Sequence, residues 1–275
     1  MKNFSKIIIA TGLLSMSHLS HAGLLTINVE DAGGLTESQF SLFGQATDLW
    51  SSLLTGIQAD FDLVMDIEAA GVYIDGEYGV LGSAGPTEAT VDSEFSYTYA
   101  TKGRMEFDTA DLDRMESDGS LFDVLIHEMA HVIGFGTFWN TDSFGGPFEG
   151  TQSVYQVGSG EYLGEYGLAE YRKEFDPDAT FIPVDLTGEE GTKDSHWDEA
   201  WAGGSSDLMT GYVQENMTIS RTTIASFADI GYETTYTHSS DAVSVDAPAS
   251  LGLLALGLGA IGFRRRSTTP QKNVL

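Results

Sequence analysis

Residues 121–135 constrain the fold most, because an almost wholly apolar stretch carries ionisable side chains in its middle. Its apolar members fall nearly all round a helix and are Leu121, Phe122, Val124, Leu125, Ile126, Met129, Ala130, Val132, Ile133 and Phe135. The polar residues at mid-length are His127, Glu128 and His131. Burying three ionisable groups without partners would cost on the order of several kcal/mol, so a buried helix of this kind needs a partner for them.

The spacing of these polar residues indicates a metal site rather than a chance match on a surface helix. His127 and His131 are four residues apart and share one helix face, so their imidazoles can bind the same zinc ion at about 2.0–2.1 Å. Glu128 would lie beside the metal, where a general base for an activated water belongs. A His-Glu-x-x-His match is expected by chance in about one chain in a hundred of this length.

Zinc in such a site needs a third protein ligand, and the number of histidines narrows the choice. The six histidines are His18, His21, His127, His131, His196 and His238. The first two lie in a segment with the features of a leader and the last lies in a serine-rich stretch, which leaves His196. In the shorter zinc-binding motif His-Glu-x-x-His-x-x-Gly-x-x-His, the third histidine would fall at position 137, which is Thr137 here. Later glutamates remain as competing ligands, namely Glu165, Glu170 and Glu174.

Gly134 predicts how the helix ends. A glycine three residues after His131 can take a left-handed conformation and stop a helix abruptly. The chain would then leave the metal, and residues 135–195 would form an inserted excursion before His196 returns to it.

Composition excludes several classes of function. The 275 residues contain 41 Asp and Glu against 13 Lys and Arg, a formal charge of −28. That balance argues against a nucleic-acid partner, because phosphates are held by an excess of basic residues. There is no cysteine, which excludes disulfides, thiolate metal ligands and a cysteine nucleophile. All acidic residues lie between Glu30 and Asp246, where only seven basic residues accompany them.

Residues 1–22 show, in the right order, the features of a secretory signal peptide. Lys2 and Lys6 precede an apolar run at 7–14, and Ser20 to Ala22 offer small residues for cleavage by signal peptidase. The mature, exported chain would begin at Gly23. A buried N-terminal helix is the alternative.

The C-terminal end divides into a linker at 238–248, an apolar and basic segment at 249–266 and a tail at 267–275. Residues 249–263 carry no charge, but this run is shorter than the about 20 residues that a bilayer span needs. The arginines at 264–266 would hold that end on the cytoplasmic side.

The apolar segment resembles the PEP-CTERM sorting signals of Gram-negative bacteria, which an exosortase-type enzyme removes. It departs from them at Asp246-Ala247-Pro248-Ala249, where those signals have Pro-Glu-Pro. The resemblance implies a secreted or outer-envelope protein that the C-terminal segment anchors transiently in the inner membrane. A lasting tail anchor is the alternative.

Residues 23–237 remain as one domain with enough chain for a sizeable core. Predicted helices cover 36–54, 121–135 and 220–230, and predicted strands cover 61–67, 72–74 and 104–108. Capping boxes are expected from Thr36 with Gln39 and from Ser120 with Asp123, and Gly231 is the expected C-cap of the last helix. Strands before helices indicate an α+β fold with a sheet against helices.

Several separated motifs resemble the leishmanolysin family of metzincin metallopeptidases, in its exported bacterial form. They are His-Glu-Met-Ala-His-Val-Ile-Gly-Phe at 127–135, a long insertion, Ser195-His196-Trp197, and Leu208-Met209-Thr210-Gly211. The flanks at 103–112 and 220–232 also match, so the similarity covers most of residues 36–235.

The resemblance implies an α+β, metzincin-like domain whose mixed sheet packs on the active-site helix. It implies an endopeptidase that hydrolyses proteins or peptides with a zinc-activated water. The implied zinc ligands are His127, His131 and His196, with Glu128 as the general base. Met209 would be the Met-turn residue beneath the metal, and Tyr212 could donate a hydroxyl to the oxyanion. Core packing is the alternative for both.

Two further expectations follow. Eukaryotic relatives hold a propeptide cysteine against the zinc, and its absence here predicts no cysteine-based latency. Four aspartates before the helix could bind calcium, although their spacing does not fit an EF-hand and a solvated acidic face is the alternative; they are Asp108, Asp111, Asp113 and Asp118.

The competing function is a non-catalytic surface or matrix protein with structural zinc on the same fold.

Overall fold

The computed structural model describes residues 23–92, 94, 96–188, 191–214 and 217–236. The predicted signal peptide, linker and C-terminal sorting segment lie outside these residues and stay predictions. Within the described part of the chain, no helix is both long and apolar enough to span a bilayer.

Four strands form a mixed sheet in the order β1-β3-β5-β4. They are β1 (Leu25–Asp31), β3 (Leu63–Val72), β4 (Gly82–Val91) and β5 (Thr98–Asp108). β1, β3 and β5 run parallel, whereas β4 pairs antiparallel with β5 and forms one edge of the sheet. The α+β fold with a mixed sheet is therefore confirmed.

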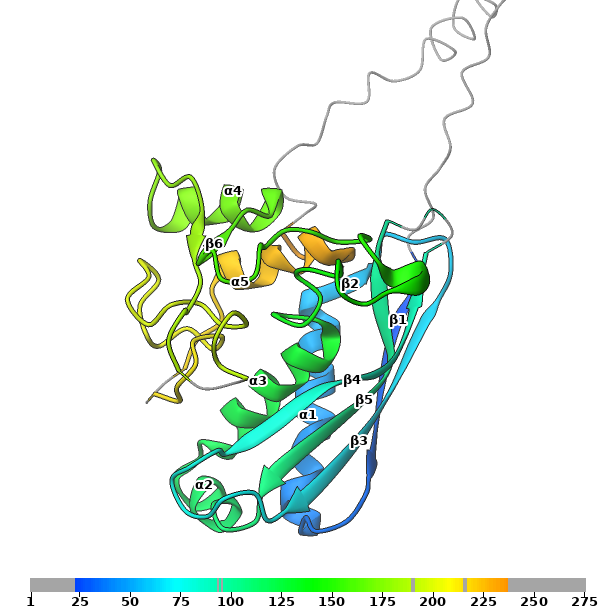
Figure 1. The fold of residues 1–275 in the computed structure, drawn as a ribbon. Coiled ribbons are helices and arrows are strands. Elements are labelled where there is room, and N and C mark those ends of the chain that lie inside the picture. Colours follow the sequence, from blue (N-terminus) through cyan, green and yellow to red (C-terminus); the bar gives the residue numbers. More distant parts are fainter. Residues whose placement is uncertain (1–22, 93, 95, 189–190, 215–216, 237–275) are drawn as a thin grey trace, which may run out of the picture. The chain divides into compact units, whose positions relative to one another are not determined.

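Alternation along β3 explains why one face of the sheet is covered. Leu63, Met65 and Ile67 are buried, while the side chains between them are exposed. Two helices pack on the covered face, α1 (Glu37–Leu53) and α3 (Leu121–Ile133), as Figure 1 shows.

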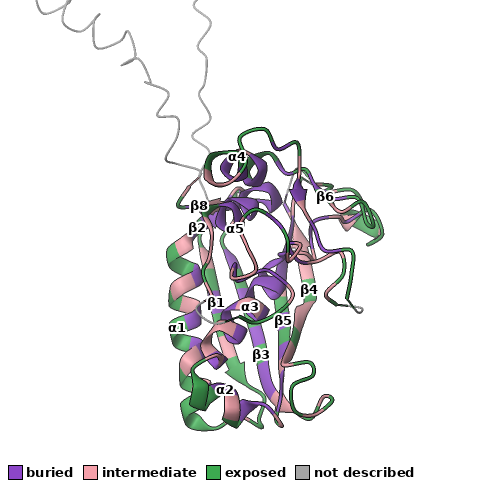
Figure 2. Ribbon diagram, turned by 90° about the vertical axis from the view of Figure 1, so that its left-hand side faces the viewer, coloured by how far each residue is buried: buried purple, intermediate pink, exposed green. Residues whose placement is uncertain are grey.

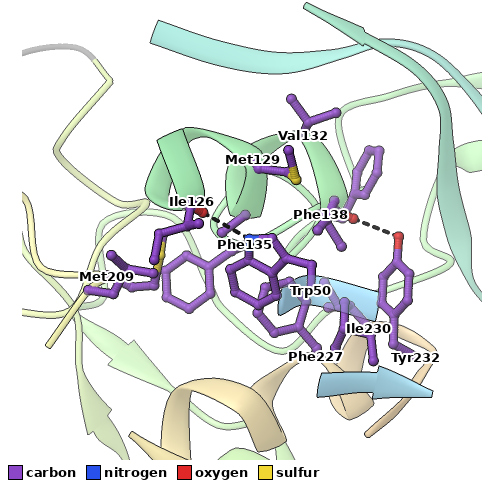
Figure 3. Close-up of a cluster of buried hydrophobic side chains, with 14 of the residues drawn as sticks. Trp50, Ile126, Met129, Val132, Phe135, Phe138, Met209, Phe227, Ile230 and Tyr232 are labelled. Atoms are coloured by element: carbon purple, nitrogen blue, oxygen red, sulfur yellow. Dashed lines mark hydrogen bonds between the residues drawn. The ribbon is translucent and has the colours of Figure 1, made fainter. Parts of the chain in front are cut away.

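Helix α1 forms as predicted, with a capping box at its start and one apolar stripe toward the core (Figure 2). The Thr36 hydroxyl accepts the Gln39 amide at 3.2 Å, and the Gln39 side chain accepts the Thr36 amide at 2.9 Å. Trp50, on the buried stripe, donates its indole N–H to the Ile126 carbonyl of α3 at 3.1 Å (Figure 3). This bond fixes α3 against α1.

Helix α3 begins differently from the prediction, since the Ser120–Asp123 capping box is absent. The preceding helix α2 (Leu112–Asp118) ends at Gly119, with a φ of 86°, and Ser120 already has helical dihedral angles. A capping side chain requires an extended N-cap residue, so Ser120 does not reach back. Instead its amide and hydroxyl donate to Asp118 at 3.0 and 2.7 Å.

Gly134 ends α3 as expected, with a positive φ of 134°. A Cβ at this position would lie only 2.7 Å from the Phe138 side chain, so the turn needs glycine for space as well as for its dihedral angle. The insertion that follows contains a short helical turn and three small elements, namely η1 (Gly146–Phe148), β6 (Glu161–Tyr162), α4 (Glu165–Glu174) and β7 (Ile182–Pro183).

The strand predictions need correction in three respects. The strand expected at 72–74 is wrong, because β3 runs unbroken to Val72 and irregular backbone follows. The strand expected at 104–108 is the second half of the longer β5. β1 and β4 were not expected at all, since β1 buries only Ile27 and β4 contains two glycines and Pro86.

The C-terminal part of the described chain closes the domain. β2 (Leu54–Ile57) pairs antiparallel with β8 (Tyr232–Thr234). The predicted helix at 220–230 is divided into α5 (Arg221–Ser226) and the 3₁₀ turn η2 (Ala228–Ile230). Gly231 ends it in the left-handed conformation, as predicted, with a φ of 96°.

Helices α4 and α5 exchange carboxylate caps. Asp229, just after α5, accepts the amides of residues 166–167 in the first turn of α4 at 2.7 and 2.8 Å. Glu174, at the end of α4, accepts the amides of residues 221–222 in the first turn of α5 at 3.1 and 2.6 Å. Each carboxylate satisfies amides that a helix cannot satisfy itself and places negative charge at the positive end of the helix dipole.

Replacement of the α4 cap, Asp229→Ala, should lower the free energy of unfolding by about 1–2 kcal/mol, because two amides of α4 lose their acceptor. Asp229→Asn should lower it less, since one side-chain oxygen remains. Urea denaturation measures both, with the exposed Asp178→Ala as control. Equal stability of Asp229→Ala and this control would contradict the capping role.

Candidate metal centre

Three imidazoles from two distant segments converge on one point. His127 and His131 project from adjacent turns of α3, and His196 comes from the segment after the insertion. Their Nε2 atoms are 3.0 Å apart for His127–His196, 3.1 Å for His127–His131 and 3.0 Å for His131–His196. Among the described residues, this is the one group of three or more histidine and carboxylate side chains whose ligand atoms come close enough to hold a metal ion.

The other nitrogen of each ring is held by a backbone carbonyl. The three Nδ1 atoms lie 2.6 Å from the Leu208 carbonyl, 2.9 Å from that of Phe135 and 2.9 Å from that of Thr192, for His127, His131 and His196 respectively. A carbonyl only accepts, so each ring carries its proton on Nδ1.

Three bare Nε2 lone pairs therefore face one another. No proton lies between them, and such an arrangement is stable only around a cation. A tetrahedral zinc at about 2.0–2.1 Å from each nitrogen would separate them by about 3.3 Å, close to the separations observed. The carbonyl partners also orient the rings, as they do in zinc sites. The donor set fits a zinc ion.

Burial keeps the imidazoles neutral. It lowers the pKa of His127, and it lowers that of His131 to about 3 with help from the neighbouring His127. Burial lowers the pKa of His196 well below its ordinary value, and the two other rings add to the effect. At neutral pH all three rings are in the form that binds metal.

Glu128 lies beside the histidines and toward β4. Its side chain is 7% exposed, and burial raises its pKa to about 8. A Cβ on Gly82 of β4 would lie 3.1 Å from Glu128 Cγ, so this strand residue leaves the space that the carboxylate occupies. A cation at the histidines would lower that pKa again by favouring the ionised carboxylate.

The three histidines and Glu128 line one cleft with a volume of about 710 Å³. Residues 79–84, which lead into β4 and include its first residues, make one wall, and the turn at 208–213 makes another. Tyr212 stands on that second wall with 54% of its surface exposed, so it does not pack in the core.

Met209 is fully buried in the same turn (Figure 3). Its carbonyl accepts the Trp197 amide at 2.9 Å, which ties the turn to the residue after His196. Asp207 holds the turn by accepting the Met209 amide at 3.0 Å and the Thr223 hydroxyl of α5 at 2.9 Å. Sequence reasoning missed Asp207, although an aspartate two residues before a turn amide is a typical Asx signal.

The competing glutamate ligands lie elsewhere. All three are on α4, and none belongs to the histidine group. Glu174 caps α5, and Glu170 forms an ion pair with Lys173.

Three of the four aspartates expected to bind calcium have other partners, including Asp118, which accepts from Ser120 and pairs with Arg114. Asp108 accepts the amides of residues 75–76, each at 2.8 Å, and Asp111 pairs with the Arg114 guanidinium at 2.7 Å. The turn that Asp108 holds leads into the β4 wall of the cleft. Calcium binding by these aspartates stays a prediction.

An α+β domain that brings three neutral imidazoles and a glutamate into one cleft has the metal centre of a metallopeptidase. A family model described as leishmanolysin, peptidase family M8, matches residues 87–244, more than half of the chain. The chain belongs to this zinc-dependent metallopeptidase family. The match includes the three histidines and Glu128. No curated protein matches the chain.

Loss of His196 should remove the metal. The purified protein should contain about one zinc ion per chain. Loss of a group that only hydrogen-bonds a metal ligand typically lowers zinc affinity ~10- to 100-fold, and His196→Ala should lower it by more than that. Elemental analysis after gel filtration measures this, with Thr137→Ala as control because Thr137 lines the cleft without facing the nitrogens. A His196→Ala protein that still held zinc tightly would refute the assignment.

Asp108 should make stability depend on acid pH. Hydrogen bonds from the Ala110 amide and from the amides of residues 74–76 lower its pKa from 3.8 to about 2. The folded-state pKa lies below the unfolded one, so the ionised carboxylate stabilises the fold above about pH 4 and loses this effect as the pH falls toward 2. The wild type should therefore exceed Asp108→Asn in unfolding free energy by a constant amount from pH 7 to 5. That difference should shrink between pH 4 and 2 in urea titrations, and a difference independent of pH would contradict this account.

Proposed function

We propose that the protein is an exported, zinc-dependent endopeptidase of the metzincin type. The observation that carries the proposal is the convergence of three unprotonated Nε2 atoms beside Glu128 in a cleft. A site that served only to stiffen the fold would not need a buried carboxylate next to the metal. Export is proposed from the two chain ends, which have the features of a signal peptide and of a sorting segment.

His127, His131 and His196 would hold the metal through Nε2. A zinc ion in that place supplies a Lewis acid for the peptide carbonyl and lowers the pKa of water toward about 7. Glu128 would act as the base that accepts a proton from the attacking water and would then pass this proton to the leaving amine. Burial suits both roles, because a carboxyl whose pKa is not far from neutral can take up a proton and release it.

The cleft walls suit an extended peptide. β4 is the edge strand of the sheet, and its first residues line the cleft. An unpaired strand edge offers amides and carbonyls to the backbone of a bound chain whatever its sequence. Tyr212, exposed on the wall at 208–213, is proposed to donate its hydroxyl proton in a hydrogen bond to the oxyanion.

Glu128→Gln should lower proteolysis strongly and keep the metal. The amide is isosteric but cannot accept the proton, so kcat/KM on casein or a peptide library should fall ~100- to 10,000-fold. Zinc content should stay at the wild-type value, since Glu128 is outside the ligand group. The matched control is Glu161→Gln, an exposed glutamate on β6.

Equal activity of Glu128→Gln and the wild type would refute the mechanism. A zinc-loaded wild type that cleaved none of a varied set of peptides would favour the non-catalytic surface protein instead.

A further inference from the structure

Two carboxylate oxygens behind the metal centre are buried and have no hydrogen-bond partner. They are Oδ2 of Asp185 and Oε1 of Glu199. Asp185 is only 2% exposed, and its other oxygen is fully used by the amide and hydroxyl of Thr187 at 2.6 and 2.7 Å. Buried carboxylate oxygens without a donor are rare, because desolvation of the charge is costly.

The two carboxylates face the same turn. A Cβ on Gly211 would lie 3.9 Å from Asp185 Oδ2. Glu199 receives backbone hydrogen bonds from Tyr212 and Gly211. The turn at 211–212 lines the cleft, whereas neither Asp185 nor Glu199 does, so both carboxylates lie behind the cleft wall.

Negative charge accumulates here without a counter-charge. Burial raises the pKa of Glu199, and the nearby carboxylates of Asp185 and Asp198 raise it further. Within the described part of the chain, none of these three acids forms an ion pair with lysine or arginine. A cation bound from solution would coordinate the unpartnered oxygens and neutralise the negative charge.

We propose that Asp185 and Glu199 bind a calcium ion. The available ligand atoms are carboxylate oxygens, which suit a hard cation and not zinc. Two carboxylates balance the charge of one divalent ion. The surrounding segments are irregular and can add backbone carbonyls and waters at the variable angles that calcium accepts. Magnesium demands a near-octahedral shell and keeps most of its own waters, so it fits this place less well.

The ion would connect the segments that carry the metal centre. The Asp185 amide donates to the His196 carbonyl at 3.0 Å, and Glu199 follows His196 by three residues. Gly211 and Tyr212 continue from Met209. Calcium would therefore hold the insertion, the His196 segment and the cleft wall together, whether or not the protein is a peptidase.

The test is a calcium titration of the zinc-loaded full chain in chelator-treated buffer. Isothermal titration calorimetry should show one calcium ion per chain, magnesium should bind at least tenfold more weakly, and calcium should raise Tm by several degrees. Absence of both calcium heat and a calcium-dependent Tm would overturn the proposal. A Tm that rose only with falling pH would overturn it too, because the pair would then share a proton instead.

Isosteric variants separate an ion site from a structural pair. Asp185→Asn and Glu199→Gln should each weaken calcium binding at least tenfold, while the exposed Asp178→Asn should not. Without calcium the two site variants should unfold at or above the wild-type Tm, since each removes an uncompensated charge. With saturating calcium the wild type should be the most stable. If the site variants were less stable than the wild type to the same degree with and without calcium, the proposed calcium site would be refuted.

Peptidase activity does not enter this measurement, so its outcome is independent of the proposed reaction.

Discussion

The structure depends on three imidazole lone pairs that point at one another with no proton between them. This arrangement is unfavourable unless the rings are held from behind, and each ring is held by a backbone carbonyl at its Nδ1. The Phe135 and Thr192 carbonyls each lie four residues from the ring that they hold. The Leu208 carbonyl lies 81 residues beyond His127, so the turn near Met209 must be in place before that ring is oriented. The metal centre is thus a property of the whole domain and not of one helix.

Helix α3 can serve this centre because it is fixed on several sides. Trp50 of α1 donates to its Ile126 carbonyl, and Tyr232 of β8 donates to its Ile133 carbonyl at 2.7 Å (Figure 3). Gly103 of β5 lets Val132 approach the sheet, since a Cβ there would lie 2.1 Å from a Val132 methyl. These contacts hold the middle and the C-terminal end of the helix, so the ionisable side chains can occupy its remaining face without loosening it.

Local signals predicted part of this fold from the sequence. The α1 capping box, the helix ends at Gly134 and Gly231, and the four-residue spacing of His127 and His131 are patterns between near neighbours in the sequence. His196 was predicted by elimination, because the chain has only six histidines. β4 was missed because its glycines and Pro86 oppose strand formation, and pairing with β5 overrides them. The capping box at Ser120 failed because a neighbouring helix had already set its dihedral angles. Asp185 and Glu199 gave no signal, since their proximity arises only from folding.

The excess of acidic over basic residues affects how carboxylates are stabilised throughout the domain. Between Glu30 and Asp246 the chain has 41 acidic and seven basic residues, so arginine and lysine can pair with only a few of the carboxylates that become buried, such as Asp111 with Arg114. Several buried acids use backbone amides: Asp108 holds the 75–76 turn, Asp207 holds Met209, and Asp229 caps α4. The less buried Glu174 caps α5 and also pairs with Arg221. Amides serve well because they are already oriented and cost little to immobilise. At Asp185 and Glu199 the available amides leave one oxygen of each carboxylate without a donor. A protein with so few lysines and arginines has few positive side chains to pair with Asp185 and Glu199, and a divalent cation from solution is the partner that we propose.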